Sequence, residues 1–235
     1  MEKKEKLYEG KAKIIYATDD PDLLIAYFKD DATAFDNTKR GTIVGKGIIN
    51  NAISSRLFEI LAKNRVPNHF VEKLSDREML IRKLEMLKLE VLVRNVVAGS
   101  LAKRMGMAEG TPLKRTVLEY CYKNDLLHDP QINEDHVLVF ELCTDQELIN
   151  IRNMALKVND VLTPFFDALG IRLIDFKLEF GRFKGETCLG DEISPDSCRL
   201  WDKKTNEKLD KDRFRRDMGG IEEAYKTVLE RVIKT

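Results

Sequence analysis

The segment IDFKLEFGRFKGETCLGDEISPDSCRLW, residues 174–201, decides the fold, because it opens as a strand with two contrasting faces. Apolar and charged residues alternate over its first seven positions. The apolar set is Ile174, Phe176, Leu178 and Phe180, and the charged set is Asp175, Lys177 and Glu179. Side chains of a strand point alternately to its two faces. One face therefore belongs to a core, and the other carries two acids and a base into a polar site.

The same segment predicts a hairpin, since Gly185 can adopt a positive φ in a turn over 182–186. A hairpin symmetric about Gly185 places Glu179 directly opposite Asp191, with Cβ atoms about 5 Å apart. Two carboxylates at that distance repel by roughly 3 kcal/mol at an effective dielectric near 20. Mg²⁺ offsets such repulsion, because it binds carboxylate oxygens together with phosphates. Two alternatives stay open: an exposed hairpin with Lys177 between the acids, and a one-residue slip that moves Asp191 to the other face.

Length and charge limit the class of protein. The chain has 235 residues, 43% of them hydrophobic, which suits one large or two small globular domains. Forty basic and forty acidic residues cancel, so no overall field attracts nucleic acid or an anionic membrane. No apolar run approaches the ~20 residues that span a bilayer. The opening MEKKEKLYEG also lacks the apolar segment of a secretory signal.

The cysteines and histidines point to a reducing compartment without a zinc site. The four cysteines, at 121, 143, 188 and 198, are far apart and form no C-x-x-C pair. They are expected to be free thiols in the cytoplasm. Three scattered histidines, at 69, 128 and 136, argue against zinc.

Hydrophobic periodicity gives a coarse order of elements. Residues 13–30 read as an antiparallel hairpin, 47–64 as an amphipathic helix, and 69–97 as strand-rich. A helix after Cys143 begins with a capping box of Thr144 and Glu147, and a kink or break is expected at Pro164. A last helix starts near Gly220. Strands dominate the first ~80 residues, which predicts an α+β protein with two lobes and a cleft between them.

Two further segments carry candidate anion sites. In YEGKAK, Gly10 permits close approach of a ligand, and Lys11 and Lys13 suit a polyphosphate. The spacing is not that of a Walker A loop, and lysines exposed on an edge strand are the alternative.

The second of these segments is LEVLVRNVVAGSLAKRMG, residues 89–106. In it, Arg94 precedes a turn at Gly99, and Ser100 is expected to cap a short helix whose N-terminus binds an anion. An ordinary serine cap is the alternative there. Arg199, expected in a turn-rich loop, is placed to reach the same ligand as Arg94.

Taken together, these segments resemble the phosphoribosylaminoimidazole-succinocarboxamide synthase (SAICAR synthetase) family. The likeness is carried by LYEGKAK (7–13), ATAFD (32–36), VRNVVAGSLAKR (93–104), KNDLLHDP (123–130), DFKLEFG (175–181) and GDEISPDSCRLWD (190–202). The resemblance implies a two-lobed, ATP-grasp-like α+β fold with antiparallel sheets and an interlobe cleft. It implies a nucleotide-binding lobe over 1–85 and a substrate and metal lobe over 86–235, in a homodimer.

The activity implied by the resemblance is an ATP-dependent ligase that joins L-aspartate to carboxyaminoimidazole ribonucleotide. The implied ATP contacts are Gly10, Lys11, Ala12, Lys13 and the backbone of Met86, and the implied Mg²⁺ ligands are Glu179 and Asp191. The implied ribonucleotide contacts are Arg94, Ser100 and Arg199 at the phosphate, with Asp175 and Asp129 orienting the imidazole or ribose. Lys177 would neutralise the carboxylate that is phosphorylated, and Asp36 with Arg215 would meet aspartate.

Two other functions compete with the ligase. A small-molecule kinase is suggested by Glu179-Phe180-Gly181, which looks like the kinase D-F-G. The chain has neither an H-R-D-x-x-x-x-N loop nor G-x-G-x-x-G, which argues against a kinase. A non-catalytic RNA-binding module is suggested by local Arg and Lys clusters. The zero net charge and the missing aromatic platform argue against that function.

Overall fold

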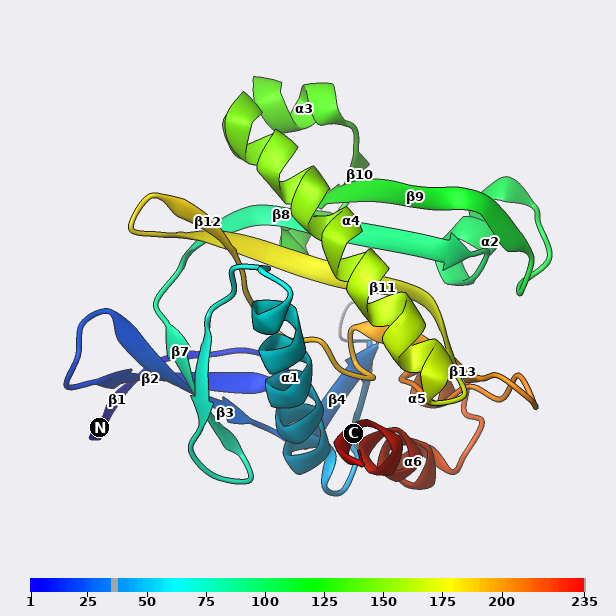
Figure 1. The fold of residues 1–235 in the computed structure, drawn as a ribbon, viewed down its shortest axis with the longest axis horizontal. Coiled ribbons are helices and arrows are strands. Elements are labelled where there is room, and N and C mark those ends of the chain that lie inside the picture. Colours follow the sequence, from blue (N-terminus) through cyan, green and yellow to red (C-terminus); the bar gives the residue numbers. More distant parts are fainter. Residues whose placement is uncertain (35–37, 235) are drawn as a thin grey trace.

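The computed structural model describes residues 1–34 and 38–234, which form two antiparallel sheets flanked by helices (Figure 1). The first sheet has the strand order β1-β2-β3-β7-β6. Its strands are Lys3–Glu9 (β1), Lys13–Thr18 (β2), Leu23–Phe28 (β3), Glu78–Arg82 (β7) and Phe70–Lys73 (β6). A separate hairpin consists of Asp31–Ala34 (β4) and Lys39–Thr42 (β5).

The second sheet has six strands, in the order β10-β9-β8-β11-β12, and β13 pairs with β11 beside β12. Its strands are Gln131–Ile132 (β10), Pro112–Tyr122 (β9), Glu85–Val96 (β8), Ile171–Phe183 (β11), Glu186–Leu189 (β12) and Cys198–Asp202 (β13). The long strand β11 is central, because β8 pairs along one side while β12 and β13 share the other.

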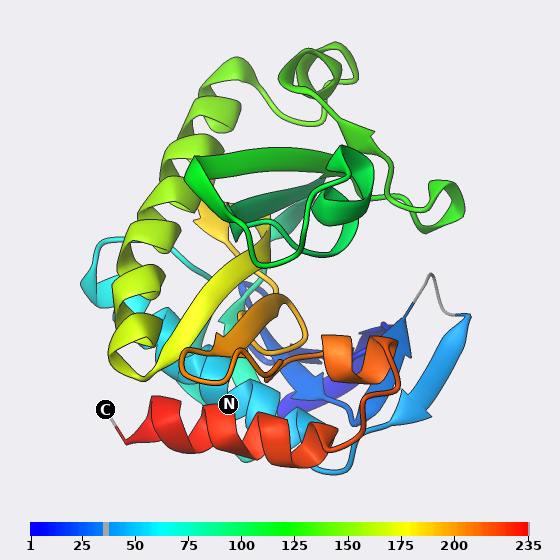
Figure 2. The same ribbon diagram turned by 90° about the vertical axis from the view of Figure 1, so that its right-hand side faces the viewer.

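Helices pack against both sheets. They are Lys46–Lys63 (α1), Gly99–Met105 (α2), the 3₁₀ turn Asp125–Leu127 (η1), Glu134–Val139 (α3), Asp145–Ala168 (α4), Asp212–Arg215 (α5) and Ile221–Ile233 (α6). Helix α1 packs against the first sheet and α4 against the second. Helix α4 lies along β11 and β8, and the β4–β5 hairpin is on the far side of the molecule from it (Figure 2). The C-terminal helix α6 packs against α1.

Strand β11 has the two faces that its alternation predicts. Phe176, Leu178 and Phe180 are buried in the main core, which also contains residues of α4. On the opposite face, Asp175 and Glu179 are each only 3% exposed. The charged face is thus a buried polar layer, and buried charges persist only when partners neutralise them.

Most of the expected elements are confirmed. The hairpin over 13–30 is β2–β3, the helix over 47–64 is α1, and α6 begins directly after Gly220. The capping box of Thr144 and Glu147 is present at the start of α4. The prediction of a break at Pro164 is wrong, since α4 continues through this residue to Ala168. Pro164 and Asp160 are exposed, so water can bind the carbonyl that the proline leaves without a donor.

The predicted register of the β11–β12 hairpin is wrong by one residue. Phe183 pairs with Glu186 and Phe180 with Leu189, which leaves a two-residue turn of Lys184 and Gly185. Both turn residues have positive φ, 51° and 86°, as a type I′ turn requires. Glu179 therefore lies opposite the position of Gly190, and Asp191 follows the end of β12.

The domain boundary between residues 85 and 86 stays a prediction. The five-stranded sheet ends at Arg82 and the six-stranded sheet begins at Glu85, so the sheets separate where the sequence suggests. One continuous core nevertheless includes residues of both sheets, and α6 returns to α1. No helix in the described part of the chain is both long and apolar enough to cross a membrane.

Candidate active site

A cavity of about 1040 Å³ opens between the two sheets and is lined by residues from both. Part of its wall is apolar and is formed by Ile15, Leu24, Ala26, Ile81, Leu84 and Met86. Another part carries polar and charged groups and includes Gly10, Lys11, Ala12, Lys13, Lys123, Asp129, Lys177, Glu179 and Asp191. An apolar wall beside convergent charged groups is the usual composition of a small-molecule site.

The turn between β1 and β2 brings two lysines to the cavity. Gly10 N–H donates to the carbonyl of Lys13 at 2.8 Å, which closes the turn. Lys11 Nζ lies 3.0 Å from Asp125 of η1, across the mouth of the cavity. Lys13 Nζ lies deeper, 2.5 Å from Asp191 and 3.2 Å from Glu192. Burial lowers the pKa of Lys13, but the charges of Asp191 and Glu192 outweigh it, and the net pKa is raised.

Lys177 is the centre of the charged face of β11. Its Nζ binds Glu179, lies 2.9 Å from Glu90 of the paired strand β8, and lies 3.9 Å from Asp191. Burial opposes its charge, yet the nearby Glu179 and Asp191 carboxylates raise the pKa of Lys177 well above its usual value. The lysine is therefore a permanent cation among three carboxylates.

Glu179 and Asp191 both line the cavity even though they are not a cross-strand pair. Asp191 has a φ of 58°, a left-handed conformation that turns the chain directly after β12. Its carboxylate then reaches both Lys13 and Lys177. Burial raises the pKa of Asp191, but Lys13 and Lys177 lower it more, so the carboxylate is charged. The two acids share Lys177, although they are not the directly opposed pair that the sequence predicts.

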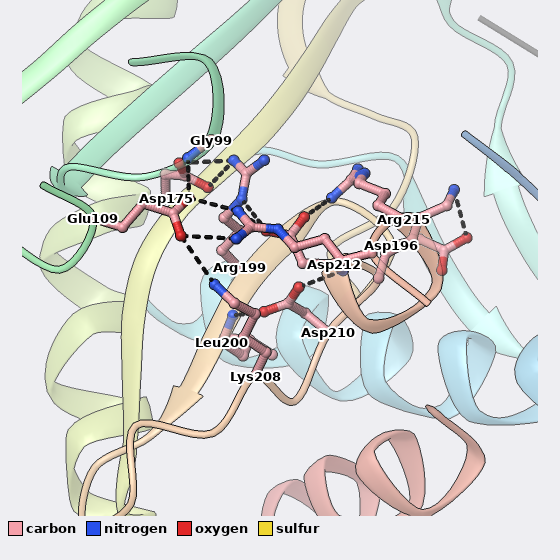
Figure 3. A network of polar contacts seen from close by, with 12 residues as sticks. Gly99, Glu109, Asp175, Asp196, Arg199, Leu200, Lys208, Asp210, Asp212 and Arg215 are labelled. Carbon is pink, nitrogen blue, oxygen red and sulfur yellow. Dashed lines mark hydrogen bonds and ion pairs between the residues drawn. The ribbon is translucent and has the colours of Figure 1, made fainter. Parts of the chain in front are cut away.

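A second charged cluster, the arginine cluster, lies at the other end of β11 (Figure 3). Arg94 is 2% exposed, and its guanidinium binds Glu119 at 2.7 Å, Asp175 at 2.9 Å and Ser100 Oγ at 3.0 Å. Arg199 of β13 binds Asp175 at 3.0 Å and Asp212 at 2.9 Å. These contacts follow the register, because Asp175 pairs with Arg94 on one side and Arg199 on the other.

Gly99 is a point of close approach in the arginine cluster. A Cβ on Gly99 would lie 2.3 Å from Nη2 of Arg199, whose guanidinium is held by two carboxylates. We expect Gly99→Ala to be about 1–3 kcal/mol less stable than Gly106→Ala. Both glycines have positive φ, 54° and 62°, but a Cβ on Gly106 meets nothing within 4 Å. Urea unfolding of both variants measures the difference, and equal losses would contradict the close approach.

The structure brings some of the predicted site residues together in the cavity. These are Gly10, Lys11, Ala12, Lys13, Met86, Asp129, Lys177, Glu179 and Asp191. Four others lie in the arginine cluster and do not line the cavity: Arg94, Ser100, Asp175 and Arg199. Arg215 binds Asp212 at 2.6 Å in that cluster, and Asp36 lies outside the described residues.

Two local expectations about these residues are wrong. Ser100 does not cap α2, because the N-cap is Ala98 and the Ser100 hydroxyl accepts a hydrogen bond from Arg94. Arg199 lies in strand β13 and not in a loop. Both errors have one physical cause. The buried Arg94 and Asp175 need polar partners and bind side chains of neighbouring segments, and the local sequence does not reveal these contacts.

Three functional candidates were missed from the sequence. Lys123 binds Glu179 from the loop after β9, inside the KNDLLHDP segment. Lys46 is 1% exposed, and its Nζ lies 2.8 Å from Asp196. His69 lines the cavity and is 5% exposed. The KNDLLHDP motif was the only signal in the sequence for Lys123. Nothing in the sequence indicated Lys46 and His69, because their partners are distant in the chain.

We expect His69→Gln to flatten the dependence of stability on pH. Burial, with the charge of Lys13, lowers the pKa of His69 to about 3 in the folded protein, against ~6.5 unfolded. Below pH 6.5 the unfolded chain binds a proton that the folded chain does not, so stability falls as pH falls. Urea unfolding at pH 7 and pH 5 should show a loss about 2 kcal/mol larger for the parent than for the variant. Equal losses would contradict a buried neutral imidazole.

An α+β fold whose cavity joins an apolar wall to lysines and carboxylates suits an enzyme that acts on a phosphorylated small molecule. A family model described as SAICAR synthetase matches residues 6–232. The chain belongs to the SAICAR synthetase family, as its sequence motifs predict, and the predicted fold class is confirmed.

Relatives and solved structures agree with this assignment. A phosphoribosylaminoimidazole-succinocarboxamide synthase of Clostridium kluyveri is 59% identical over 232 residues, 99% of each chain. The crystal structure of such a synthase from Ehrlichia chaffeensis is 47% identical, with a TM-score of 0.96 over 97% of this chain and 98% of that one. A SAICAR synthetase in complex with ADP is 48% identical, with a TM-score of 0.94 over 97% of each chain.

Proposed function

We propose that this protein joins L-aspartate to the carboxylate of carboxyaminoimidazole ribonucleotide with the conversion of ATP to ADP and phosphate. As a member of its family, the chain is an ATP-dependent ligase of purine biosynthesis. The observation that carries the residue-level proposal is the cluster of Lys13, Lys177, Glu179 and Asp191 in one cavity beside an apolar wall.

A carboxylate is a poor electrophile, so it must be activated before an amine can attack it. One carboxylate oxygen bonds to the γ-phosphorus of ATP as the bond to ADP breaks, which gives an acyl phosphate. The amine of aspartate then attacks the acyl carbon, phosphate leaves, and the nitrogen loses a proton. Phosphoryl transfer depends chiefly on positioning and charge neutralisation, and fixed cations provide both.

For the nucleotide, we assign the phosphates to the Gly10–Lys13 turn and the base to the apolar wall near Met86. Lys11 and Lys13 come from one tight turn and both line the cavity. The backbone of Met86 lies at the start of β8, where the chain passes from one sheet to the other. The relative solved with ADP supports the use of ATP here.

For Mg²⁺, the donor chemistry of Glu179 and Asp191 fits. Both carboxylates line the cavity, and Mg²⁺ favours one or two carboxylates plus substrate phosphates over a cage made of protein alone. No cluster of three or more His, Cys, Asp or Glu suited to a metal occurs among residues 1–34 and 38–234, in keeping with such a shared site. When bound, the ion would neutralise phosphate oxygens. Lys13, Lys123 and Lys177 hold the two carboxylates in place.

For the ribonucleotide, we assign its phosphate to the arginine cluster. Arg199 is the more accessible arginine, with an 18% exposed side chain against 2% for Arg94. Arg199 would therefore contact the phosphate, while Arg94 positions Asp175 and Ser100. Asp129 would orient the imidazole or ribose from the cavity wall. Lys177 would neutralise the carboxylate that is phosphorylated.

The remaining assignments are compartment, assembly and the aspartate site. Asp36 and Arg215 remain our candidates for aspartate. We propose a cytoplasmic enzyme, supported by the four free cysteines at 121, 143, 188 and 198. We further propose a homodimer that binds neither nucleic acid nor membrane. Light scattering on the purified chain tests the dimer.

A coupled assay for ADP, run with each substrate omitted in turn, tests the reaction. We expect steady ADP release only when ATP, Mg²⁺, the ribonucleotide and L-aspartate are all present. Sustained release without aspartate, or transfer of labelled phosphate to a stable hydroxyl, would contradict the ligase and favour a kinase.

A further inference from the structure

The carboxylate of Glu109, in the loop between α2 and β9, lies among donors at the edge of the arginine cluster (Figure 3). The Arg216 guanidinium binds it with both terminal nitrogens, at 2.5 and 2.9 Å. Gly99 N–H donates to it at 3.0 Å, and Lys208 Nζ lies 3.4 Å away. The fork of an arginine fits a carboxylate and a phosphate alike. The donors that hold Glu109 are therefore suited to the phosphate of a ligand as well.

This group of donors adjoins a nitrogen of Arg199 that is available to a ligand. Nε and Nη1 of Arg199 bind Asp212 and Asp175, whereas its Nη2 makes no hydrogen bond to any residue that the structure describes. A Cβ on Gly99 would lie 2.3 Å from this Nη2, and the N–H of the same Gly99 binds Glu109. An anion that reaches Nη2 of Arg199 therefore meets the Glu109 carboxylate beside it, and like charges so close repel.

Glu109 can leave its position at low cost. Its side chain is 30% exposed and that of Arg216 is 40% exposed, and ion pairs with such exposure contribute little to stability. The cations would stay in place without it. Lys208 Nζ lies 4.5 Å from the centroid of the Trp201 ring, and its side chain is only 12% exposed. Arg216 keeps a second contact, with Asp212 at 3.5 Å.

We propose that Arg216 and Lys208 bind the phosphate of the ribonucleotide together with Arg199, and that Glu109 occupies their site until the phosphate displaces it. The proposal rests on the proposed function, which assigns this phosphate to the arginine cluster. A phosphate monoester carries roughly two negative charges near pH 7, against one for a carboxylate. It also has three oxygens that accept hydrogen bonds, enough for all three cations. Glu109 is thus an internal competitor that a phosphate displaces more readily than a singly charged anion does.

Calorimetric titration of the ribonucleotide with Mg²⁺ and ADP, and without ATP, tests the proposal, because the ligand then binds without reacting. We expect Glu109→Gln and Glu109→Ala each to bind the ribonucleotide at least about fivefold more tightly than the parent, since each removes the competing charge. Arg216→Gln should bind it at least about fivefold less tightly, since a charged contact to the phosphate is lost. If Glu109 only held its loop in place, its loss would weaken binding instead.

Glu147→Gln provides the matched control. Two nitrogens of Arg182 bind Glu147 at 2.5 and 3.0 Å, so this substitution removes the same charge from the same kind of pair. In the described part of the chain, Glu147 binds only Arg182 and Thr144, which lie outside the arginine cluster. Its affinity for the ribonucleotide should stay within about twofold of that of the parent. Separate titrations of ADP show whether a change is confined to the ribonucleotide.

Unchanged or weaker ribonucleotide binding in a folded Glu109 variant would overturn the displacement. Parental affinity in Arg216→Gln, equal tightening in Glu147→Gln, or an equal change in the affinity for ADP would also overturn it. Thermal unfolding verifies that each variant is folded, and the alanine variant decides alone if the glutamine variant is not. A parent that binds ADP but not the ribonucleotide would overturn the proposed function itself, together with this inference.

Discussion

Glu179→Gln is expected to lower turnover by at least about 10³-fold with little change in the fold. An amide keeps the shape of the side chain but loses the charge that would hold Mg²⁺, and such an ion contributes several kcal/mol to stabilising transferred charge. Glu179 is 3% exposed and binds Lys177 and Lys123, so its position is fixed before any ligand enters. Steady-state ADP release, with circular dichroism as a check on folding, measures the effect.

Glu90→Gln provides the matched control for this prediction. Glu90 binds the same Lys177 at 2.9 Å and lines the same cavity, but it is not a proposed metal ligand. Burial raises the pKa of Glu90, although the charge of Lys177 opposes this shift. We expect a loss of about tenfold or less. Equal losses in the two variants would indicate that charge around Lys177, and not a metal, is what Glu179 supplies.

Arg94→Ala is expected to destabilise the protein by about 3–5 kcal/mol, because it removes one of the two arginines that neutralise each of two buried carboxylates, Glu119 and Asp175. Arg94 lies between Glu119 and Asp175, which are 8% and 3% exposed. The sequence alone predicted a different main effect, weaker binding of the ribonucleotide, from the strand and serine around this arginine. Because the guanidinium is buried, we now expect the main effect of Arg94→Ala to be a loss of stability. Urea unfolding measures the loss.

Arg104→Ala is the control for the arginine prediction. Arg104 binds the other oxygen of Glu119, but its side chain is 39% exposed. Exposed ion pairs contribute about 0–1 kcal/mol, so this variant should remain nearly as stable as the parent. Parental stability of Arg94→Ala, combined with weaker ribonucleotide binding, would contradict the structural role and restore Arg94 as a direct contact.

Local sequence was sufficient for the elements that local physics determines. Alternation along β11 predicted its core face and its charged face, and both are present. The capping box at Thr144 identified the start of α4, since the cap and the helix lie within four residues of one another. The motifs from residue 7 to residue 202 were enough to identify the family.

Sequence was insufficient where one residue of register or a distant partner decides the outcome. The turn between β11 and β12 could be centred on Gly185 or on the pair Lys184 and Gly185. The structure has the second arrangement, a two-residue turn whose twist matches that of the strands. Lys46 pairs with Asp196, and Lys123 with Glu179, across long stretches of chain. Such pairings are created by tertiary structure and leave no local pattern.

The proposed function depends most on Glu179 and Asp191 holding one divalent ion beside the phosphates of the nucleotide. Binding of Mn²⁺ in place of Mg²⁺, followed by electron paramagnetic resonance with and without ADP, measures this directly in the parent, Glu179→Gln and Asp191→Asn. We expect ADP to tighten Mn²⁺ binding in the parent and each substitution to weaken the ADP-dependent binding at least about tenfold. Unchanged ADP-dependent binding of Mn²⁺ in both variants would contradict the proposed function.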